Sequence, residues 1–342
     1  MTNTMKAVEI AAFGGPENLR VCQRPVPAPG PGEVLLKVAA AGVNRPDATQ
    51  RRGLYPPPPG ITDIPGLDVA GQVIALGQGV TGIEPGDFLC GLVAGGGYAE
   101  YVTVPQPQCL PIPAGLGLVE AASLPEVYFT AWNKVCEVGR LQQGETILVQ
   151  GGTSGVGIAA IQIARHVIDA RVIAMVGDKD KAGACLELGA HHVVSYRDAD
   201  WDRQAHDWTG GQGIDVILDA QAGDYIEREL AILATGGRLV LMATHQDTHA
   251  NVNFRQVVRR RLTIAGSVIR ARSPEQKGVL TRALLREVWP RVEAGAIRTR
   301  IQQTFPLNQA VDAHVVLENN EQRGKLVLVV DEALVAAYGK GR

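Results

Sequence analysis

One stretch of the chain constrains its fold more than any other, TILVQGGTSGVGIAAIQIAR at residues 146–165. Residues 146–150 form the short apolar, β-branched run of a buried strand, and residues 158–164 repeat apolar side chains at helical spacing. Between them, GGTSGVG predicts a tight turn from strand to helix. Such a turn leaves the N–H groups and the positive dipole end of the helix open to an anion, and glycines let a pyrophosphate come close.

The glycine turn therefore predicts a dinucleotide site. In the G-x-G-x-x-G spacing that ends at Gly157, Ser154 stands where the second glycine is usual. Its hydroxyl can donate to phosphate, although its Cβ limits how closely the ligand approaches. The candidate pyrophosphate contacts are Gly152, Ser154, Gly155, Val156 and Gly157.

The rest of the chain divides around this turn. Apolar runs at 171–176, 192–195, 214–219 and 238–242 each follow a polar segment of helix length, which predicts a doubly wound parallel sheet. Short strands separated by Pro and Gly come before it and predict a β-rich, partly closed domain. Further along, the pattern predicts a long helix at 274–295. We expect an α/β chain whose residues 126–269 are a nucleotide-binding domain inserted into a β-rich domain, residues 1–125 and 270–342.

Composition restricts the environment and the partners. The formal net charge is −2 over 342 residues, so no global charge attracts nucleic acid or acidic membranes. The basic cluster RRR at 259–261 is interpreted as a solvated helix end, and we expect no nucleic-acid partner. Neither an export signal nor a membrane-spanning run is evident. The five cysteines lack Cys-x-x-Cys spacing, which predicts reduced thiols and a cytoplasmic protein.

Several segments together carry a resemblance to a known family. They are EVLLKVAAAGVNRPDATQRRGLYPPPPG, GLDVAGQV, GGGYAEYV, QGGTSGVGIAAIQIA and GKLVLVV. In these segments and in their order, the chain resembles the zinc-independent quinone oxidoreductases of the medium-chain dehydrogenase/reductase superfamily. FGGPENLRV and the Ser of GGTSGVG are most similar to the branch of the p53-inducible quinone oxidoreductase. The resemblance implies a Rossmann domain inserted into a GroES-like domain, with the active site in a cleft between them.

The resemblance also implies that the chain uses no metal. Where zinc-dependent relatives carry a ligand Cys, this chain has Asn44, and where they carry a ligand His it has Leu67. The region of the four-cysteine structural zinc lobe holds only Cys90. Without a Lewis acid, the hydride acceptor must already be electron-poor, as quinones and activated enones are.

Two residues are predicted to act on the substrate. Asn44 and Tyr55 match family positions that face the nicotinamide. An amide can fix a ribose hydroxyl or a carbonyl oxygen, and a phenol can donate to a developing oxyanion. Packing of Tyr55 among the prolines that follow it is the alternative interpretation.

The choice of cofactor depends on the residues after the second strand. Family positions for the 2′-phosphate of NADPH are matched by Gly177, Lys181 and Tyr196, but Asp178 replaces a family Ser. An acid about twenty residues after the glycines is typical of NAD sites, so Asp178 leaves NADH open as the alternative to NADPH. The remaining family matches near the nicotinamide are Thr130, Ser267, Ile269 and Lys325.

We therefore predict NADPH-dependent reduction of a small-molecule quinone without zinc. Reduction of α,β-unsaturated ketones or aldehydes is the enzymatic alternative. A protein that binds NADPH, and RNA, with little turnover, like the crystallin members of the family, is the alternative from another class. The family further implies a homodimer.

Overall fold

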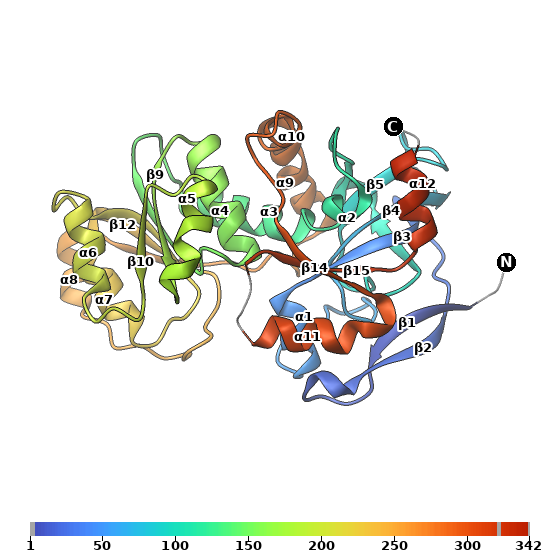
Figure 1. The fold of residues 1–342 in the computed structure, drawn as a ribbon, viewed down its shortest axis with the longest axis horizontal. Coiled ribbons are helices and arrows are strands. Elements are labelled where there is room, and N and C mark those ends of the chain that lie inside the picture. Colours follow the sequence, from blue (N-terminus) through green and yellow to red (C-terminus); the bar gives the residue numbers. More distant parts are fainter. Residues whose placement is uncertain (1–3, 320–322, 341–342) are drawn as a thin grey trace. The chain divides into compact units, whose positions relative to one another are not determined.

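The computed structural model describes residues 4–319 and 323–340 and divides the chain into two compact units. Unit 1 comprises Met1–Phe129, Ile269–Glu293 and Thr299–Arg342, and unit 2 comprises Thr130–Val268 and Ala294–Arg298. Unit 2 is thus an almost continuous stretch of chain, whereas unit 1 is assembled from separate segments (Figure 1).

Unit 2 is built on a six-stranded sheet whose strands are all parallel. In spatial order the strands are β10 (His192–Ser195), β9 (Arg171–Val176), β8 (Thr146–Gln150), β11 (Ile214–Asp219), β12 (Leu233–Leu241) and β13 (Thr263–Gly266). The sequence order therefore reverses direction between β8 and β11, the arrangement of a doubly wound sheet. This confirms the fold predicted from the glycine turn and the apolar runs.

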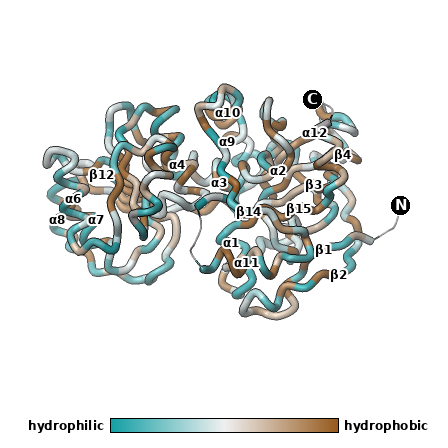
Figure 2. Tube along the Cα trace, viewed as in Figure 1, coloured by the Kyte–Doolittle hydropathy of each residue, from teal (hydrophilic) through white to brown (hydrophobic). Residues whose placement is uncertain are grey.

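Helices cover both faces of this sheet, as Figure 1 shows. On one face lie α4 (Gly155–His166) and α5 (Ala182–Glu187), and on the other α6 (Trp201–Trp208), α7 (Tyr225–Ile232) and α8 (Phe254–Arg260). The strands read as nearly continuous apolar runs because both faces are buried. In Figure 2 the strands of this sheet are largely brown, whereas α6, α7 and α8 carry many hydrophilic residues in teal.

Residues 118–138 form three separate helical elements. These are α2 (Leu118–Ala121), α3 (Pro125–Trp132) and the π-helical η3 (Asn133–Val138). Pro125 opens α3, where its missing N–H has no helical acceptor to lose. A π-helical turn is rare and often marks a functional site.

Unit 1 is built on a mixed sheet in which β3 (Glu33–Val43) has the central place. The path through the sheet is β14 (Ile301–Pro306), β15 (Lys325–Val329), β3, β4 (Asp68–Leu76), β5 (Phe88–Leu92) and β7 (Cys109–Pro111), and β6 (Tyr101–Pro105) also pairs with β3. Strand β3 therefore contacts β15, β4 and β6. Because β15 comes from the far end of the chain, the sheet is complete only when both ends of the sequence meet.

Shorter elements surround this sheet. They are the hairpin β1 (Thr4–Ile10) and β2 (Leu19–Pro25), and the helices α1 (Arg45–Arg51), α9 (Pro274–Glu287), α10 (Trp289–Glu293), α11 (Ala310–Glu318) and α12 (Glu332–Lys340). Four short helical turns complete the elements: η1 (Pro16–Asn18), η2 (Gln106–Gln108), η4 (Lys179–Lys181) in unit 2 and η5 (Leu307–Gln309). The helix predicted over 274–295 is divided near Val288, since Pro290 offers no N–H to an α-helical bond. Among the described residues, no helix has the length and apolarity that crossing a bilayer requires.

Two glycines provide a matched test of packing. A Cβ at Gly71 in β4 would lie 2.1 Å from the carbonyl oxygen of Lys37, whereas a Cβ at Gly183 in α5 would meet nothing within 4 Å. We expect Gly71→Ala to lower the free energy of unfolding by about 1 to 3 kcal/mol through overpacking. Gly183→Ala should leave it unchanged or raise it by up to about 1 kcal/mol. Thermal unfolding of both variants checks this, and equal melting temperatures would contradict the close β3–β4 approach.

Candidate functional site

The glycine turn after β8 is as tight as its sequence predicts. Gly151 has φ of +66°, a conformation that a side chain disfavours. A Cβ built on Gly157 would lie 2.2 Å from the carbonyl oxygen of Gly151, so this position accepts only glycine. The turn therefore brings the backbone of residues 151–157 close together at the carboxyl end of β8.

Ser154 begins the helix that follows. Its hydroxyl oxygen accepts a hydrogen bond from the N–H of Gly157 at 3.1 Å, the contact of an N-cap residue. The hydroxyl hydrogen is not used by that bond. The N–H groups of Gly155 and Val156 lie in the first helical turn, where an α-helix supplies no acceptor. Ser154, Gly155 and Val156 are half-buried, so an anion can reach these donors.

A second set of predicted residues meets after β9 and β10. A Cβ at Gly177 would lie 2.4 Å from the Tyr196 hydroxyl oxygen, so the absence of a side chain lets the phenol approach. Ser195 donates to the carbonyl oxygen of Gly177 at 3.0 Å and holds the two segments together. Tyr196 is 45% exposed, and Lys181 directly precedes α5. The structure thus brings Gly177 and Tyr196 together.

Arg197 was not among the residues predicted from the sequence. Its guanidinium donates to the carboxylate of Asp178 in an exposed ion pair. Asp178 is therefore neutralised by a neighbouring cation, and a carboxylate that is already paired repels a phosphate less. The sequence does place Arg197 directly after the predicted residue Tyr196. It does not show that Arg197, after β10, pairs with Asp178, after β9.

Lys134 in the π-helical turn is another residue that the sequence reading missed. Its ammonium is buried and donates to the carbonyl oxygens of Leu241 at 2.9 Å and Ser267 at 2.6 Å. The Ser267 hydroxyl in turn donates to Asn133 at 2.5 Å. The predicted residue Thr130 lies one helical turn before Lys134. This cluster fixes the segment after β13 in unit 2.

In unit 1, Asn44 lies in a buried polar network. The Asn44 side chain, at 4% exposure of the residue, donates through Nδ2 to Asp68 Oδ1 at 2.7 Å. Its Oδ1 accepts from Lys325 Nζ at 2.5 Å, and the same ammonium lies 3.4 Å from Asp68 Oδ2. Two predicted residues, Asn44 and Lys325, are thus in direct contact. Cofactor binding by Lys325 stays a prediction.

Asp47 extends this network beneath Asn44. Its carboxylate accepts from the N–H groups of Asn44 at 2.8 Å and Gly66 at 3.1 Å, and from the Tyr98 hydroxyl at 3.2 Å. The Tyr98 oxygen also lies 3.1 Å from His314 Nε2. Burial raises the pKa of Asp47 to about 7 although both N–H groups oppose the shift. Asp47 thus caps the N-terminus of α1 and holds the backbone of Asn44, the residue whose side-chain amide was predicted to act on the substrate.

Tyr55 lies in a segment without regular secondary structure between α1 and β4. The residue is half-buried, and burial raises the pKa of its phenol, partly opposed by the cation of Arg270. The phenol is therefore protonated at neutral pH and can donate a hydrogen bond. Ile269, also in unit 1, directly precedes Arg270 in the chain.

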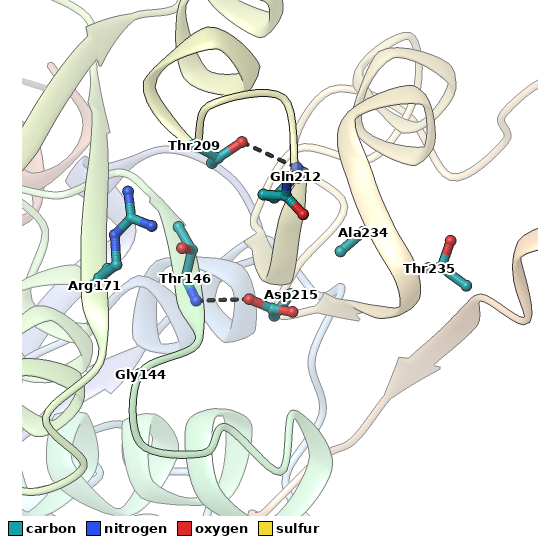
Figure 3. Close-up of a pocket in the computed structure, with 9 residues that line it drawn as sticks. Gly144, Thr146, Arg171, Thr209, Gln212, Asp215, Ala234 and Thr235 are labelled. Carbon is teal, nitrogen blue, oxygen red and sulfur yellow. Dashed lines mark hydrogen bonds between the residues drawn. The ribbon is translucent and has the colours of Figure 1, made fainter.

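The pocket in Figure 3 lies at the amino ends of the unit 2 strands, whereas the glycine turn follows the carboxyl end of β8. It encloses about 430 Å³ next to the first residues of β8 and β9, where the Thr146 N–H donates to Asp215 at 2.8 Å. Ligands of open α/β sheets bind at the carboxyl ends of the strands. The pocket is at the amino ends, so it is not the predicted cofactor site.

The side chains that stand at the zinc-ligand positions of zinc-dependent relatives lie in unit 1. Leu67 and Asn44 are both buried, and neither offers the thiolate or imidazole that zinc prefers. Across residues 4–319 and 323–340, no three His, Cys, Asp or Glu side chains are grouped as metal ligands. The cation in contact with Asn44 and Asp68 is the ammonium of Lys325.

Comparison with known proteins places these features in a family. The model of the alcohol dehydrogenase GroES-like domain matches residues 30–114, and that of the zinc-binding dehydrogenases matches residues 155–284. The rat quinone oxidoreductase is 30% identical over 95% of this chain and 98% of its own length. A mycobacterial protein solved with NADPH is 29% identical, covers 95% of this chain and 100% of its own, and has a TM-score of 0.84. An NAD-dependent alcohol dehydrogenase structure is 33% identical with the same coverage and a TM-score of 0.82.

The buried ammonium is open to a direct test. Lys325→Met would leave the carboxylate of Asp68 buried without its cation, and removing one partner of a buried ion pair destabilises a protein by about 3 to 5 kcal/mol. We expect a clear loss of stability in denaturant unfolding. The double variant Lys325→Met with Asp68→Asn should recover part of that loss, because no unpaired charge remains. A single variant as stable as the parent protein would show that the ammonium and the carboxylate do not interact.

Proposed function

Since the chain is an oxidoreductase of the medium-chain dehydrogenase/reductase superfamily, we propose that it reduces quinones with NADPH and without zinc. The rat quinone oxidoreductase aligns with 95% of this chain. The sequence features that suggest the branch of the p53-inducible quinone oxidoreductase are Ser154 and the segment at 13–21.

The observation that carries the proposal is the contact between Asn44, Asp68 and Lys325. In zinc-dependent relatives a Cys stands at the position of Asn44, and a metal there polarises the substrate oxygen. Here the amide is held between the Asp68 carboxylate and the Lys325 ammonium, and among the described residues no further His, Cys, Asp or Glu side chains join Asp68 as a set of metal ligands. A substrate of this site must accept a hydride without such help. Quinones meet that requirement because their carbonyl carbons are conjugated and their reduced form is aromatic.

Two residues act on the quinone in this proposal. The Tyr55 phenol donates a hydrogen bond to a quinone oxygen, and Asn44 orients the ring or the ribose through its amide. Preorganised donors of this kind stabilise charge that develops in the transition state. The final proton can come from water, so no residue has to act as an obligatory acid. Tyr55→Phe is therefore a mild change, whereas loss of the ring removes positioning as well.

NADPH, when bound, supplies the hydride. The turn at 151–157 fits its pyrophosphate, since the approach at Gly157 excludes a Cβ and the donors at the start of α4 are accessible. Tyr196, Lys181 and Arg197 would hold the 2′-phosphate. The residues proposed toward the nicotinamide are Thr130, Ser267, Ile269 and Lys325. The structure of a mycobacterial relative with NADPH supports this choice of cofactor.

We also propose a homodimer in the cytoplasm. Strand β13 is the last strand of the unit 2 sheet, and Phe254, Val258 and Ile264 in or near it are exposed apolar residues. A free sheet edge with apolar neighbours is suited to pairing with a second copy. The five cysteines, all within the described residues, form no disulfide, which agrees with a reducing compartment.

The function is tested by NADPH oxidation with a panel of quinones, enones and alkenals. We expect turnover of quinones, unchanged by EDTA, and no stoichiometric zinc by elemental analysis. Turnover restricted to enones would favour the alternative enone or alkenal reductase. NADPH binding without turnover, together with an RNA gel shift, would favour the crystallin-like alternative. Activity that EDTA removes and zinc restores would overturn the metal-free mechanism.

Cofactor selection depends on the charges around Asp178. We expect Lys181→Met and Arg197→Ala each to weaken NADPH about tenfold, because a charge-assisted hydrogen bond contributes about 1.5 to 3 kcal/mol. NADH binding should change little, since NADH lacks the 2′-phosphate. Arg203→Ala, which removes an exposed arginine paired with Asp200, is the control. Equal losses for both cofactors, or a parent protein that prefers NADH, would mean that Asp178 selects the cofactor.

A further inference from the structure

The segment that carries Tyr55 has few backbone donors of its own, and the backbone bond within it joins the Ile61 N–H to the carbonyl oxygen of Pro58 at 3.1 Å. Tyr55 is followed by PPPP at 56–59, and these four residues have no N–H. The segment contains no helix or strand as far as β4. The carbonyl oxygen of Tyr55 is not bonded within the segment, and a donor from elsewhere in unit 1 is needed if Tyr55 is to keep one position.

Arg270 supplies such donors. The residue is 7% exposed, and its guanidinium donates from Nη1 to the carbonyl oxygen of Tyr55 at 3.1 Å. Nε donates to the carbonyl oxygen of Ala94 at 2.7 Å, and the guanidinium carbon lies 5.0 Å from the centroid of the Tyr55 ring. A single side chain thus contacts both the backbone and the aromatic face of Tyr55.

The third donor of Arg270 reaches the other end of the same segment. Nη2 donates to Gln50 Oε1 at 2.6 Å, and Gln50 Nε2 donates to the carbonyl oxygen of Asp63 at 2.8 Å. Gln50 itself is buried in α1. The segment from Tyr55 to Asp63 is therefore tied at both ends to one guanidinium.

Arg270 is itself held from behind. Lys277 in α9 is buried and donates to the carbonyl oxygen of Arg270 at 2.9 Å. Burial, together with the charge of Arg270, lowers the pKa of Lys277 to about 8. The three acceptors of the guanidinium are neutral groups, so no ion pair is formed. The hydrogen bonds instead fix the positions of these acceptors through the directions of the three donors. A buried cation without a carboxylate acceptor is unfavourable unless its donors are satisfied.

We propose that Arg270 is a positioning residue that holds Tyr55 and the segment at 55–63 in the arrangement that quinone reduction needs. This inference rests on the proposed function, and it adds a residue that acts through Tyr55. A planar guanidinium with donors in fixed directions can make these contacts together, whereas an ammonium cannot.

The test compares Arg270→Met and Arg270→Lys with Arg282→Met, an exposed arginine of the same helix as Lys277. We expect Arg270→Met to lower kcat/KM for quinone about tenfold or more, as loss of charge-assisted hydrogen bonds does. NADPH affinity should change by less than about threefold, and Arg270→Lys should be intermediate because the cation beside the ring is kept. Arg282→Met should behave as the parent protein.

A double-mutant cycle distinguishes positioning from general damage. In a Tyr55→Ala background, Arg270→Lys should have little further effect on kcat/KM, since residues that act through one another are not additive. An equal loss with and without Tyr55 would overturn the proposal. The Lys variant keeps the cycle usable if the Met variant fails to fold.

Hydrogen exchange provides a readout that does not depend on turnover. The amides at 60–64 should exchange faster in Arg270→Lys than in Arg282→Met. Unchanged exchange would refute the positioning role even if activity fell. Faster exchange in a protein that reduces no quinone would instead uphold the role of Arg270 and reject the proposed function.

Discussion

One buried cation links three strands of the unit 1 sheet through their side chains. Lys325 opens β15 near the end of the chain and donates to Asn44 at the end of β3, with Asp68 at the start of β4 beside it. The ammonium therefore joins three neighbouring strands from distant parts of the sequence. An unpaired charge at this depth would be strongly unfavourable, and so the three side chains are stable only together. The same contact fixes the amide on which the proposed substrate site depends.

In unit 2 the main constraint is the small space between the turn after β8 and the first residues of α4. The Gly157 position excludes a Cβ, and Ser154 closes the helix N-terminus while neighbouring N–H groups stay accessible. The turn connects β8 to α4, and in the proposed function its accessible N–H groups bind the pyrophosphate. Arg197 alters the chemistry at the next strand end, where Asp178 alone would favour a ribose diol. In the proposed function, the ion pair of Asp178 with Arg197 lowers the repulsion that Asp178 would exert on a 2′-phosphate.

The proline run at 56–59 makes the position of Tyr55 depend on donors from outside its own segment. Prolines restrict the backbone and so reduce the entropy lost on ordering the segment, yet they cannot donate to it. Arg270 provides the missing donors from a segment more than two hundred residues away in the chain. A rigid but unanchored loop thereby becomes one with a defined position for Tyr55. The prolines restrict the backbone of the segment, and Arg270 supplies hydrogen bonds that position it.

The sequence by itself determined the doubly wound sheet, because apolar period, glycine spacing and helix starts are local properties that a linear pattern records. It also identified Asn44, Tyr55 and the residues of the glycine turn as candidates. Only the tertiary structure decided their partners. The contact of Lys325 with Asn44, the pairing of Arg197 with Asp178, the carbonyls that Lys134 holds and the contacts of Arg270 all join residues distant in sequence. A linear pattern shows which side chains can donate or accept, but the fold alone brings a donor within reach of its acceptor.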